Sequence, residues 1–334
     1  MQSRPPDLSD ATLAAAISQG WGIGPTTVTY QPVGYGSHHW SAEDGRGGRW
    51  FTSVDVLEQA DPEASLHRLR AALVVAVTAR AAGLAYVVAP VPATDGSVLR
   101  RLPGGYALAV YPHVDGKPGG FGDGLAPAES TELTGMLCAL HDLPPAAASG
   151  IVTEDFRVPD REGLVAALRE TPGEWPGPYG ERLRRLLTRH AVSIGEVLAE
   201  HDRLVFGSAA RRDRFVITHG EPHPGNLMRT SEGLLLIDWE TALLAPPERD
   251  VWLLDARSGE GTADDYTARC GRPLDPGLLS RYRLAWALAD VALFVDLLRT
   301  TSDETDDTAW SWEALRGTLE ELSTARESAA RGEA

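Results

Sequence analysis

The sequence predicts an α+β protein in which a small lobe of antiparallel strands precedes a larger, mostly helical lobe. Strand-like segments separated by glycine-rich turns are concentrated before residue 112. After residue 120 the apolar residues recur instead at the spacing of helices. Between these regions lies YPHVDGKPGG, residues 111–120, whose glycines and prolines are typical of a linker. We therefore expect an N-terminal lobe at 1–110, a linker at 111–120 and a C-terminal lobe at 121–334.

The elements of the N-terminal lobe follow from capping residues, alternation and turns. Ser9 or Asp10 can cap a first helix, and Gly83 ends a second, alanine-rich one. Glycine-rich turns separate the first three strands. The expected elements are, in order, a helix at 9–20, strands at 26–33, 38–42 and 49–54, a helix at 62–82, and strands at 86–90 and 105–111.

The C-terminal lobe is expected to be helical except between residues 215 and 237. Apolar residues three and four apart predict helices at 127–142, 161–170, 179–201, 276–299 and 309–328. Two apolar runs predict the strands of this lobe, one at Phe215–His219 and a hairpin at 226–237.

Composition limits the classes of partner. The 334 residues, of which 43% are apolar, suffice for two cores. A formal net charge of −16 argues against nucleic acid and anionic membranes and suits a cationic small molecule. No apolar run is long enough to predict a membrane span. The N-terminal residues lack the pattern of a secretory signal, so we expect a cytoplasmic protein. Cys138 and Cys270 are therefore expected as free thiols. Nothing in the composition gives an oligomeric state.

The segment HGEPHPGNLMRTSEGLLLIDWE, residues 219–240, concentrates the polar chemistry of the chain. A loop carrying Glu221 and Asn226 leads into an apolar hairpin that ends in Asp238. Carboxylate and amide oxygens are hard ligands suited to Mg²⁺. Two such residues flanking a hairpin are how phosphotransferases hold Mg²⁺ against nucleotide phosphates.

A family resemblance rests on this segment and on motifs around it. These are HGEPHPGN at 219–226, LIDWE at 236–240, LAPPERD at 244–250, LHDLP at 140–144 and RYRLAWALAD at 281–290. Together they resemble the aminoglycoside phosphotransferases, or choline-kinase-like group, and most of all the spectinomycin phosphotransferases. The resemblance implies a two-lobe protein-kinase-like fold, Mg²⁺ as cofactor, and ATP or GTP as phosphoryl donor.

The resemblance also implies roles for individual residues. Glu221 stands where the family has the aspartate that takes the proton of the acceptor hydroxyl. Asn226 and Asp238 match the metal ligands. His219, His223 and Asp250 match positions that brace the loop. Further residues match weaker positions: Gly34, Gly36, Ser37, His38, Ser53, Pro112 and Val114 for nucleotide binding, and Glu240, Asp255, Trp286 and Asp290 for substrate binding.

Two departures from the family pattern stand out. Kinases of this shape carry a lysine on the third strand, where this sequence has Ser53, and the partner glutamate on the following helix is also missing. The base position holds Glu221, whose additional methylene displaces its oxygens by roughly 1 Å, and such a shift can cost about 10²-fold in rate. A cation could come from His38 or His39 in the glycine-rich turn, or from arginine nearby.

Three functions remain open at this point. The first is an enzyme that phosphorylates a hydroxyl of a small molecule, such as an aminocyclitol or another antibiotic in a resistance reaction. The second is a pseudokinase that binds a ligand or a nucleotide without phosphoryl transfer. The third keeps the fold but transfers another group from a nucleotide, since fold alone does not fix the chemistry.

Overall fold

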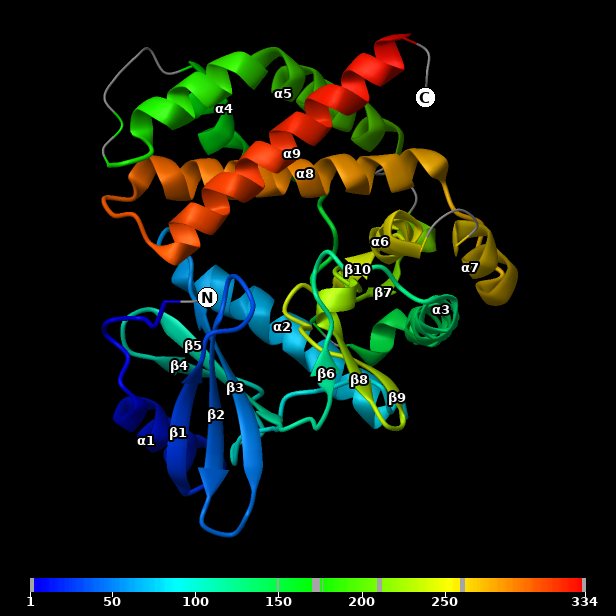
Figure 1. Cartoon of the computed structure of the whole chain (residues 1–334). Helices are drawn as coiled ribbons and strands as arrows, with labels where there is room; N and C mark the ends of the chain where they lie inside the picture. The colour runs from blue at the N-terminus through cyan, green and yellow to red at the C-terminus, as the bar shows by residue number, and fades with distance from the viewer. Residues whose placement is uncertain are drawn as a thin grey trace. The chain divides into compact units, whose positions relative to one another are not determined.

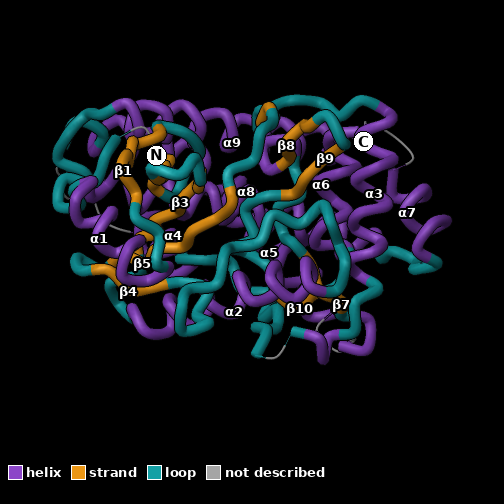
Figure 2. Tube along the Cα trace, turned by 90° about the horizontal axis from the view of Figure 1, so that it is seen from below, coloured by secondary structure: helices purple, strands orange, loops and turns teal. Residues whose placement is uncertain are grey.

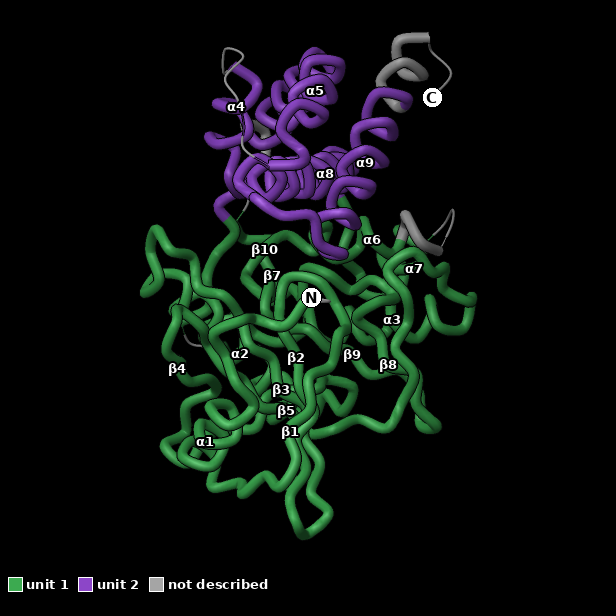
Figure 3. The backbone as a smooth tube through the Cα atoms, turned by 60° about the vertical axis from the view of Figure 1, so that its left-hand side comes forward, with its two compact units in different colours: residues 1–154, 212–274 green, residues 155–211, 275–334 purple. Residues whose placement is uncertain are grey.

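The computed structural model describes the chain except residues 1–2, 149, 170–174, 176, 209–211, 259–261 and 332–334. Its internal contacts group the chain into two compact units, which are coloured separately in Figure 3. Unit 1 comprises residues 1–154 and 212–274, and unit 2 comprises residues 155–211 and 275–334. The expected linker at 111–120 falls within unit 1, and the division into lobes at this linker stays a prediction.

A five-stranded antiparallel sheet forms the first part of unit 1 (Figure 1). Its strand order is β1-β2-β3-β5-β4, with β1 at Pro25–Gln31, β2 at His38–Asp44, β3 at Arg49–Val56, β5 at Tyr106–Pro112 and β4 at Arg100–Leu102. Alternation gives the sheet two apolar faces. Trp40 and Val54 belong to one core with helix α1, whereas Ala107 and Ala109 belong to another with helix α2.

The two helices that pack with this sheet begin at capping residues. Helix α1, Asp10–Trp21, starts after Ser9, whose hydroxyl accepts from the Thr12 N–H at 3.1 Å. Helix α2, Pro62–Ala81, starts after Asp61, whose carboxylate accepts from the Ala64 N–H at 3.0 Å. These side chains satisfy N–H groups that a helix start leaves without partners. Both helices were expected from the sequence.

The rest of unit 1 contains the polar loop, residues 219–226, and the hairpin formed by the next two strands, β8 and β9. Two small sheets carry them, β10-β7 and β6-β8-β9, and Figure 2 shows the β8–β9 hairpin apart from the five-stranded sheet. The strands are β6 at Lys117–Pro118, β7 at Val216–Thr218, β8 at Leu227–Thr230, β9 at Gly233–Leu236 and β10 at Leu243–Ala245. The helices are α3 at Pro127–His141, α6 at Glu248–Ser258 and α7 at Thr262–Cys270.

Unit 2 is helical in the part that the structure describes. It contains α4 at Arg161–Arg169, α5 at Gly180–Ser208, α8 at Pro276–Thr300 and α9 at Asp306–Arg331. Their apolar faces form one core, which includes Leu183, Ile194, Val291 and Leu315. Helix α8 starts after Asp275, whose carboxylate accepts from the Gly277 N–H at 2.8 Å. Among the described residues of both units, no helix is long and apolar enough to cross a membrane.

The α+β class is confirmed, but the expectation that strands after residue 120 lie only between 215 and 237 is wrong, because β10 follows at Leu243–Ala245. Two further sequence expectations are wrong. Residues 86–90 form no strand of the large sheet, because their backbone bonds to the hairpin instead. The Leu236 N–H donates to the Tyr86 carbonyl at 2.8 Å, and the Val88 N–H donates to the Leu236 carbonyl at 3.0 Å. The fifth strand is β4, which was not predicted because two of its three residues are arginines and show no apolar pattern.

The expectation of free thiols is the second error. Cys138 at the end of α3 and Cys270 at the end of α7 form a disulfide, with a Cα–Cα distance of 5.3 Å. A sequence separation of 132 residues gave no indication that the two cysteines meet. Helix α7 itself was not expected, so no element was predicted to carry Cys270 toward α3.

Candidate active site

Asp250, at the start of α6, hydrogen-bonds to the backbone of the polar loop. The carboxylate is fully buried and accepts the His219 N–H at 2.9 Å and the Gly220 N–H at 2.6 Å. His141 Nε2 lies 3.0 Å from the same carboxylate. Burial by itself would raise the pKa of Asp250, but the His141 hydrogen bond and neighbouring positive charges bring it below its usual value. Asp250 is therefore an ionised anchor for the loop backbone.

His219 is the second anchor of the loop, and it is neutral. Its Nδ1 accepts the Glu221 N–H at 3.1 Å, so Nε2 carries the hydrogen and donates to the Ile237 carbonyl at 2.9 Å. Burial lowers its pKa to about 4. The ring also packs edge-on against Trp239, with centroids 4.7 Å apart. His219 thus ties the loop to the segment that carries Asp238.

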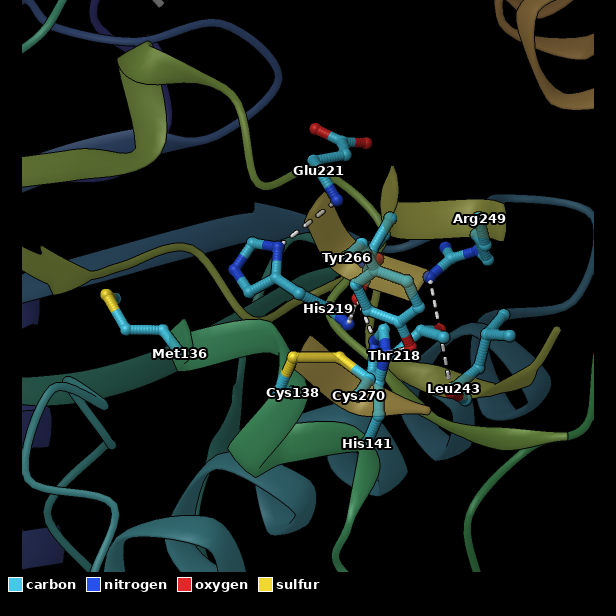
Figure 4. A network of polar contacts seen from close by, with 12 residues as sticks. Met136, Cys138, His141, Thr218, His219, Glu221, Leu243, Arg249, Tyr266 and Cys270 are labelled. Atoms are coloured by element: carbon cyan, nitrogen blue, oxygen red, sulfur yellow. Dashed lines mark hydrogen bonds and ion pairs between the residues drawn. A yellow bond between two sulfur atoms is a disulfide. The ribbon is translucent and has the colours of Figure 1, made fainter. Parts of the chain in front are cut away.

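Glu221 lies on this loop with one third of its side chain exposed. Exclusion of water raises its pKa to about 7, the charge of Asp238 adds to the rise, and Arg249 opposes it. A carboxyl group with a pKa near neutrality can both accept and release a proton. Figure 4 shows Glu221 projecting from the loop above His219.

Asn226 and Asp238 are brought together by the backbone. The Ile237 N–H donates to the Asn226 carbonyl at 3.0 Å, and Asn226 Nδ2 donates to the Glu221 carbonyl at 3.0 Å. That bond occupies the amide nitrogen, so the amide oxygen is the atom left to serve as a ligand. Asp238 has the left-handed backbone angle φ 65°, and the residue is accessible to solvent although many protein atoms surround its carboxylate.

The charge around Asp238 favours a divalent cation. Surrounding atoms that exclude water, followed by the charge of Glu240, raise the pKa of Asp238 to about 8. A carboxylate among carboxylates is stabilised by a cation, and the oxygens of Asp238 and Asn226 suit Mg²⁺. Among the described residues, no three His, Cys, Asp or Glu side chains converge as a metal site.

Carboxylates and serines occupy the region where kinases of this shape carry the strand lysine. Ser53 Oγ on β3 donates to Glu240 Oε1 at 3.0 Å. Ser37 Oγ, from the glycine-rich turn, lies 2.6 Å from Asp55 Oδ1 and 3.2 Å from Glu240 Oε2. Burial, followed by the charge of Asp55, raises the pKa of Glu240 well above its usual value. Lys117, the lysine of this sequence, lies instead on β6.

The glycine-rich turn supplies no charged histidine on the Ser53 side. His39 pairs with Ser53 in the register of β2 and β3, and its ring stacks on Phe51 with centroids 5.1 Å apart. Burial lowers the pKa of His39 to about 4, so the ring is neutral at pH 7. His38 points to the other face, where Nδ1 lies 3.3 Å from the Tyr30 hydroxyl. Gly34 and Gly36 have φ of 71° and 91°, which glycine adopts readily.

The remaining predicted residues are placed less tightly. His223 Nε2 lies 3.9 Å from Glu221 Oε2. Pro112 is the last residue of β5, and Val114 packs against the same core as α2. Asp255 belongs to α6, but its side chain lies outside the described residues. Trp286 and Asp290 lie on α8, which belongs to unit 2.

Sequence reasoning missed three residues that support the loop. Arg249 donates to Thr218 Oγ1 at 3.0 Å and to the Thr241 carbonyl at 2.8 Å, and it packs against Gly220. Tyr266 of α7 lies with its hydroxyl 2.6 Å from His141 Nδ1. Figure 4 shows His141 and Tyr266 next to the disulfide. The motifs LHDLP and LAPPERD contain His141 and Arg249, but nothing in the sequence marked Tyr266.

Known proteins match this chain in sequence and in fold. The model of the phosphotransferase enzyme family matches residues 32–272. Protein StrN of Streptomyces griseus is 31% identical over 242 residues, which cover 68% of this chain and 70% of StrN. A spectinomycin phosphotransferase, solved with ADP and spectinomycin, superposes with a TM-score of 0.73 at 16% identity, covering 96% of this chain and 99% of that chain. The microcompartment-associated aminopropanol kinase gives 0.61 at 16% identity, covering 96% and 98%.

Proposed function

This chain belongs to the phosphotransferase enzyme family, and on that basis we propose that it transfers the γ-phosphoryl group of ATP or GTP to a hydroxyl of a small molecule. The observation that carries the proposal is the position of Glu221, Asn226 and Asp238 relative to one another. Glu221, whose pKa is raised to about 7, lies on the loop that carries Asn226, and the Asn226 carbonyl accepts from the N–H of Ile237, the residue before Asp238.

The proposed reaction needs little covalent chemistry from the protein. The acceptor oxygen forms a bond to the γ-phosphorus as the bond between that phosphorus and the β-phosphate oxygen breaks. The proton of the acceptor hydroxyl passes to a carboxylate oxygen of Glu221. Asn226 and Asp238 would hold Mg²⁺, which supplies charge neutralisation for the phosphate groups. Asp250 and His219 keep the loop in place throughout, because both are buried and fully engaged with backbone groups.

The acceptor is proposed to be a small cationic molecule, such as an aminocyclitol antibiotic. A net charge of −16 favours the approach of a cation. The solved relatives named above are a kinase of aminopropanol and a phosphotransferase seen with spectinomycin, which supports an acceptor of this kind. Conversion of such an antibiotic to its phosphate ester would be a resistance reaction.

A transfer assay tests the proposal. The purified protein is incubated with ATP or GTP, Mg²⁺ and a panel of aminocyclitols and amino alcohols, and products are followed by ³¹P NMR. We expect a new phosphate-ester signal with one acceptor. The matched control is Glu221→Gln, which keeps the size of the side chain but cannot take the proton. A protein that binds Mg²⁺–nucleotide yet forms no ester with any acceptor would contradict the proposal.

A further inference from the structure

Three segments far apart in the sequence meet at Glu240. Ser37 comes from the turn between β1 and β2, Ser53 and Asp55 come from β3, and Glu240 follows Asp238 by two residues. All of them belong to unit 1. In kinases with a strand lysine, that side chain links the third strand to the nucleotide and to a helix. The corresponding region here contains hydroxyls and carboxylates, so β3 is linked to a different element.

Both carboxylate oxygens of Glu240 are engaged. Ser53 Oγ contacts Oε1 at 3.0 Å and Ser37 Oγ contacts Oε2 at 3.2 Å. These contacts come from two different elements, the third strand and the glycine-rich turn. A hydrogen bond in a site that excludes water is costly to break, so each contact restrains the position of Glu240.

Only Trp239 separates Glu240 from Asp238, so a restraint on Glu240 also restrains the backbone of Asp238. Trp239, the residue between them, is fully buried, and its Nε1 donates to the Leu236 carbonyl at 3.0 Å. Asp238 itself holds a left-handed backbone angle, φ 65°, which non-glycine residues adopt only when their surroundings impose it. A segment fixed on both sides of Asp238 supplies such surroundings.

Helix α2 does not provide the usual alternative link. Its first-turn acid, Glu63, pairs with Arg101 of β4. The residues that α2 buries are leucine, valine and alanine, which form the core with Ala107 and Ala109. The helix therefore packs on the sheet through apolar contact, and Ser53 uses its hydroxyl on Glu240.

We propose that Glu240 is a positioning residue: through Ser53 and Ser37 it fixes the Asp238 segment to the third strand and the glycine-rich turn. This role rests on the proposed function, in which Asp238 holds the metal. Glu240 then acts through its hydrogen-bond contacts with the two serines and does not ligate the cation. In this chain a serine–carboxylate network replaces the lysine–glutamate pair as the link between β3 and the rest of the site.

The test compares Glu240→Gln with Glu240→Ala. Glutamine keeps an oxygen that can accept from Ser53 and an amide that can bond to Ser37 or Asp55, but it removes the charge. Alanine removes every contact. Ser53→Ala removes one contact on the opposite side, and thermal unfolding of each variant confirms that it is folded.

Two readouts are measured, one of which needs no metal. In metal-free protein, hydrogen–deuterium exchange of peptides covering 49–56 and 234–242 is expected to be about tenfold faster in Glu240→Ala and unchanged in Glu240→Gln. In calorimetric titrations with ADP and Mg²⁺, Glu240→Ala is expected to bind about tenfold more weakly, a loss of about 1.4 kcal/mol. Glu240→Gln is expected to bind within about threefold of the unaltered protein.

The outcomes separate this inference from the proposed function. If glutamine weakens binding as much as alanine does, Glu240 acts through its charge, and the inference is overturned. If alanine changes neither exchange nor binding, the network positions nothing, and the inference is again overturned. If the unaltered protein binds no Mg²⁺–ADP, the proposed function fails, while the exchange measurement still decides whether Glu240 fixes the Asp238 segment.

Discussion

Removing the Cys138–Cys270 disulfide is expected to lower the free energy of unfolding substantially. The bond closes a loop with a sequence separation of 132 residues. In the chain-entropy treatment, closing a loop of this length stabilises the folded state by about 5 kcal/mol. Folded domains are typically stable by only about 5–15 kcal/mol, so the bond accounts for a large share of the stability.

The same bond supports the polar loop. Cys138 lies one helical turn before His141 on α3, and Cys270 lies one turn after Tyr266 on α7. His141 and Tyr266 are themselves in contact at 2.6 Å, and His141 contacts Asp250. Loss of the disulfide is therefore expected to loosen the α3–α7 pair and, through Asp250, the loop that carries Glu221.

Urea unfolding of the oxidised protein, the protein reduced with a dithiol, and the Cys138→Ser/Cys270→Ser variant measures this effect. The variant serves as the control, because it should match the reduced protein and should not respond to the dithiol. Oxidised and reduced proteins that agree within about 1 kcal/mol would refute the entropic reasoning. Two reactive thiols in native protein that has met no reductant would refute the disulfide itself.

Three further predictions concern single side chains. The rate of phosphoryl transfer should rise with pH up to about 7, because Glu221 must be ionised to take a proton; a flat kcat profile across pH 5.5–8.5 would count against this role. The Asp250→Ala variant should lose at least about 3 kcal/mol of unfolding free energy, measured in urea, since two buried N–H groups lose their acceptor; a loss under about 1 kcal/mol would contradict the anchoring role. The free energy of unfolding of the Asp238→Asn variant should rise relative to that of the unaltered protein as pH increases from 3.8 toward about 8. The reason is that, over this range, Asp238 binds a proton in the folded state but has released it in the unfolded state. Calorimetric unfolding without metal measures the difference, and a difference that does not change with pH would show that the pKa of Asp238 is not raised.

The sequence predicted the elements whose signals are local. Capping by Ser9, the helix end at Gly83, alternation along β2 and β3, and the apolar hairpin before Asp238 are readable from a few neighbouring residues. These signals placed most helices, four of the five strands of the large sheet and the loop of Glu221. The family motifs supplied the expected roles for that loop, since each motif falls on one continuous segment.

Features that depend on distant contacts could not be predicted in the same way. Tyr86 and Val88 have a strand-like composition, but their backbone groups bond to Leu236. The disulfide joins residues separated by 132 positions, on helices of which one was not expected. The neutral state of His39 follows from burial against Phe51, which no local pattern records.

The Glu240 network is the clearest case of information missing from the sequence. The absence of a strand lysine was visible, but its replacement was not, because Ser53 and Glu240 lie 187 residues apart. Glu240 was expected to contact substrate, whereas its oxygens bond to Ser53 and Ser37. Its role as a substrate ligand stays a prediction, to be weighed against the positioning role proposed above.

Calorimetric titration with ATP and with GTP, each with and without Mg²⁺, tests the central claim most directly. The account predicts micromolar binding of at least one nucleotide that requires Mg²⁺ and is lost in the Asp238→Ala variant. Binding that is indifferent to Mg²⁺, or that survives in Asp238→Ala, would contradict the metal role of Asp238 and with it the proposed phosphotransferase mechanism.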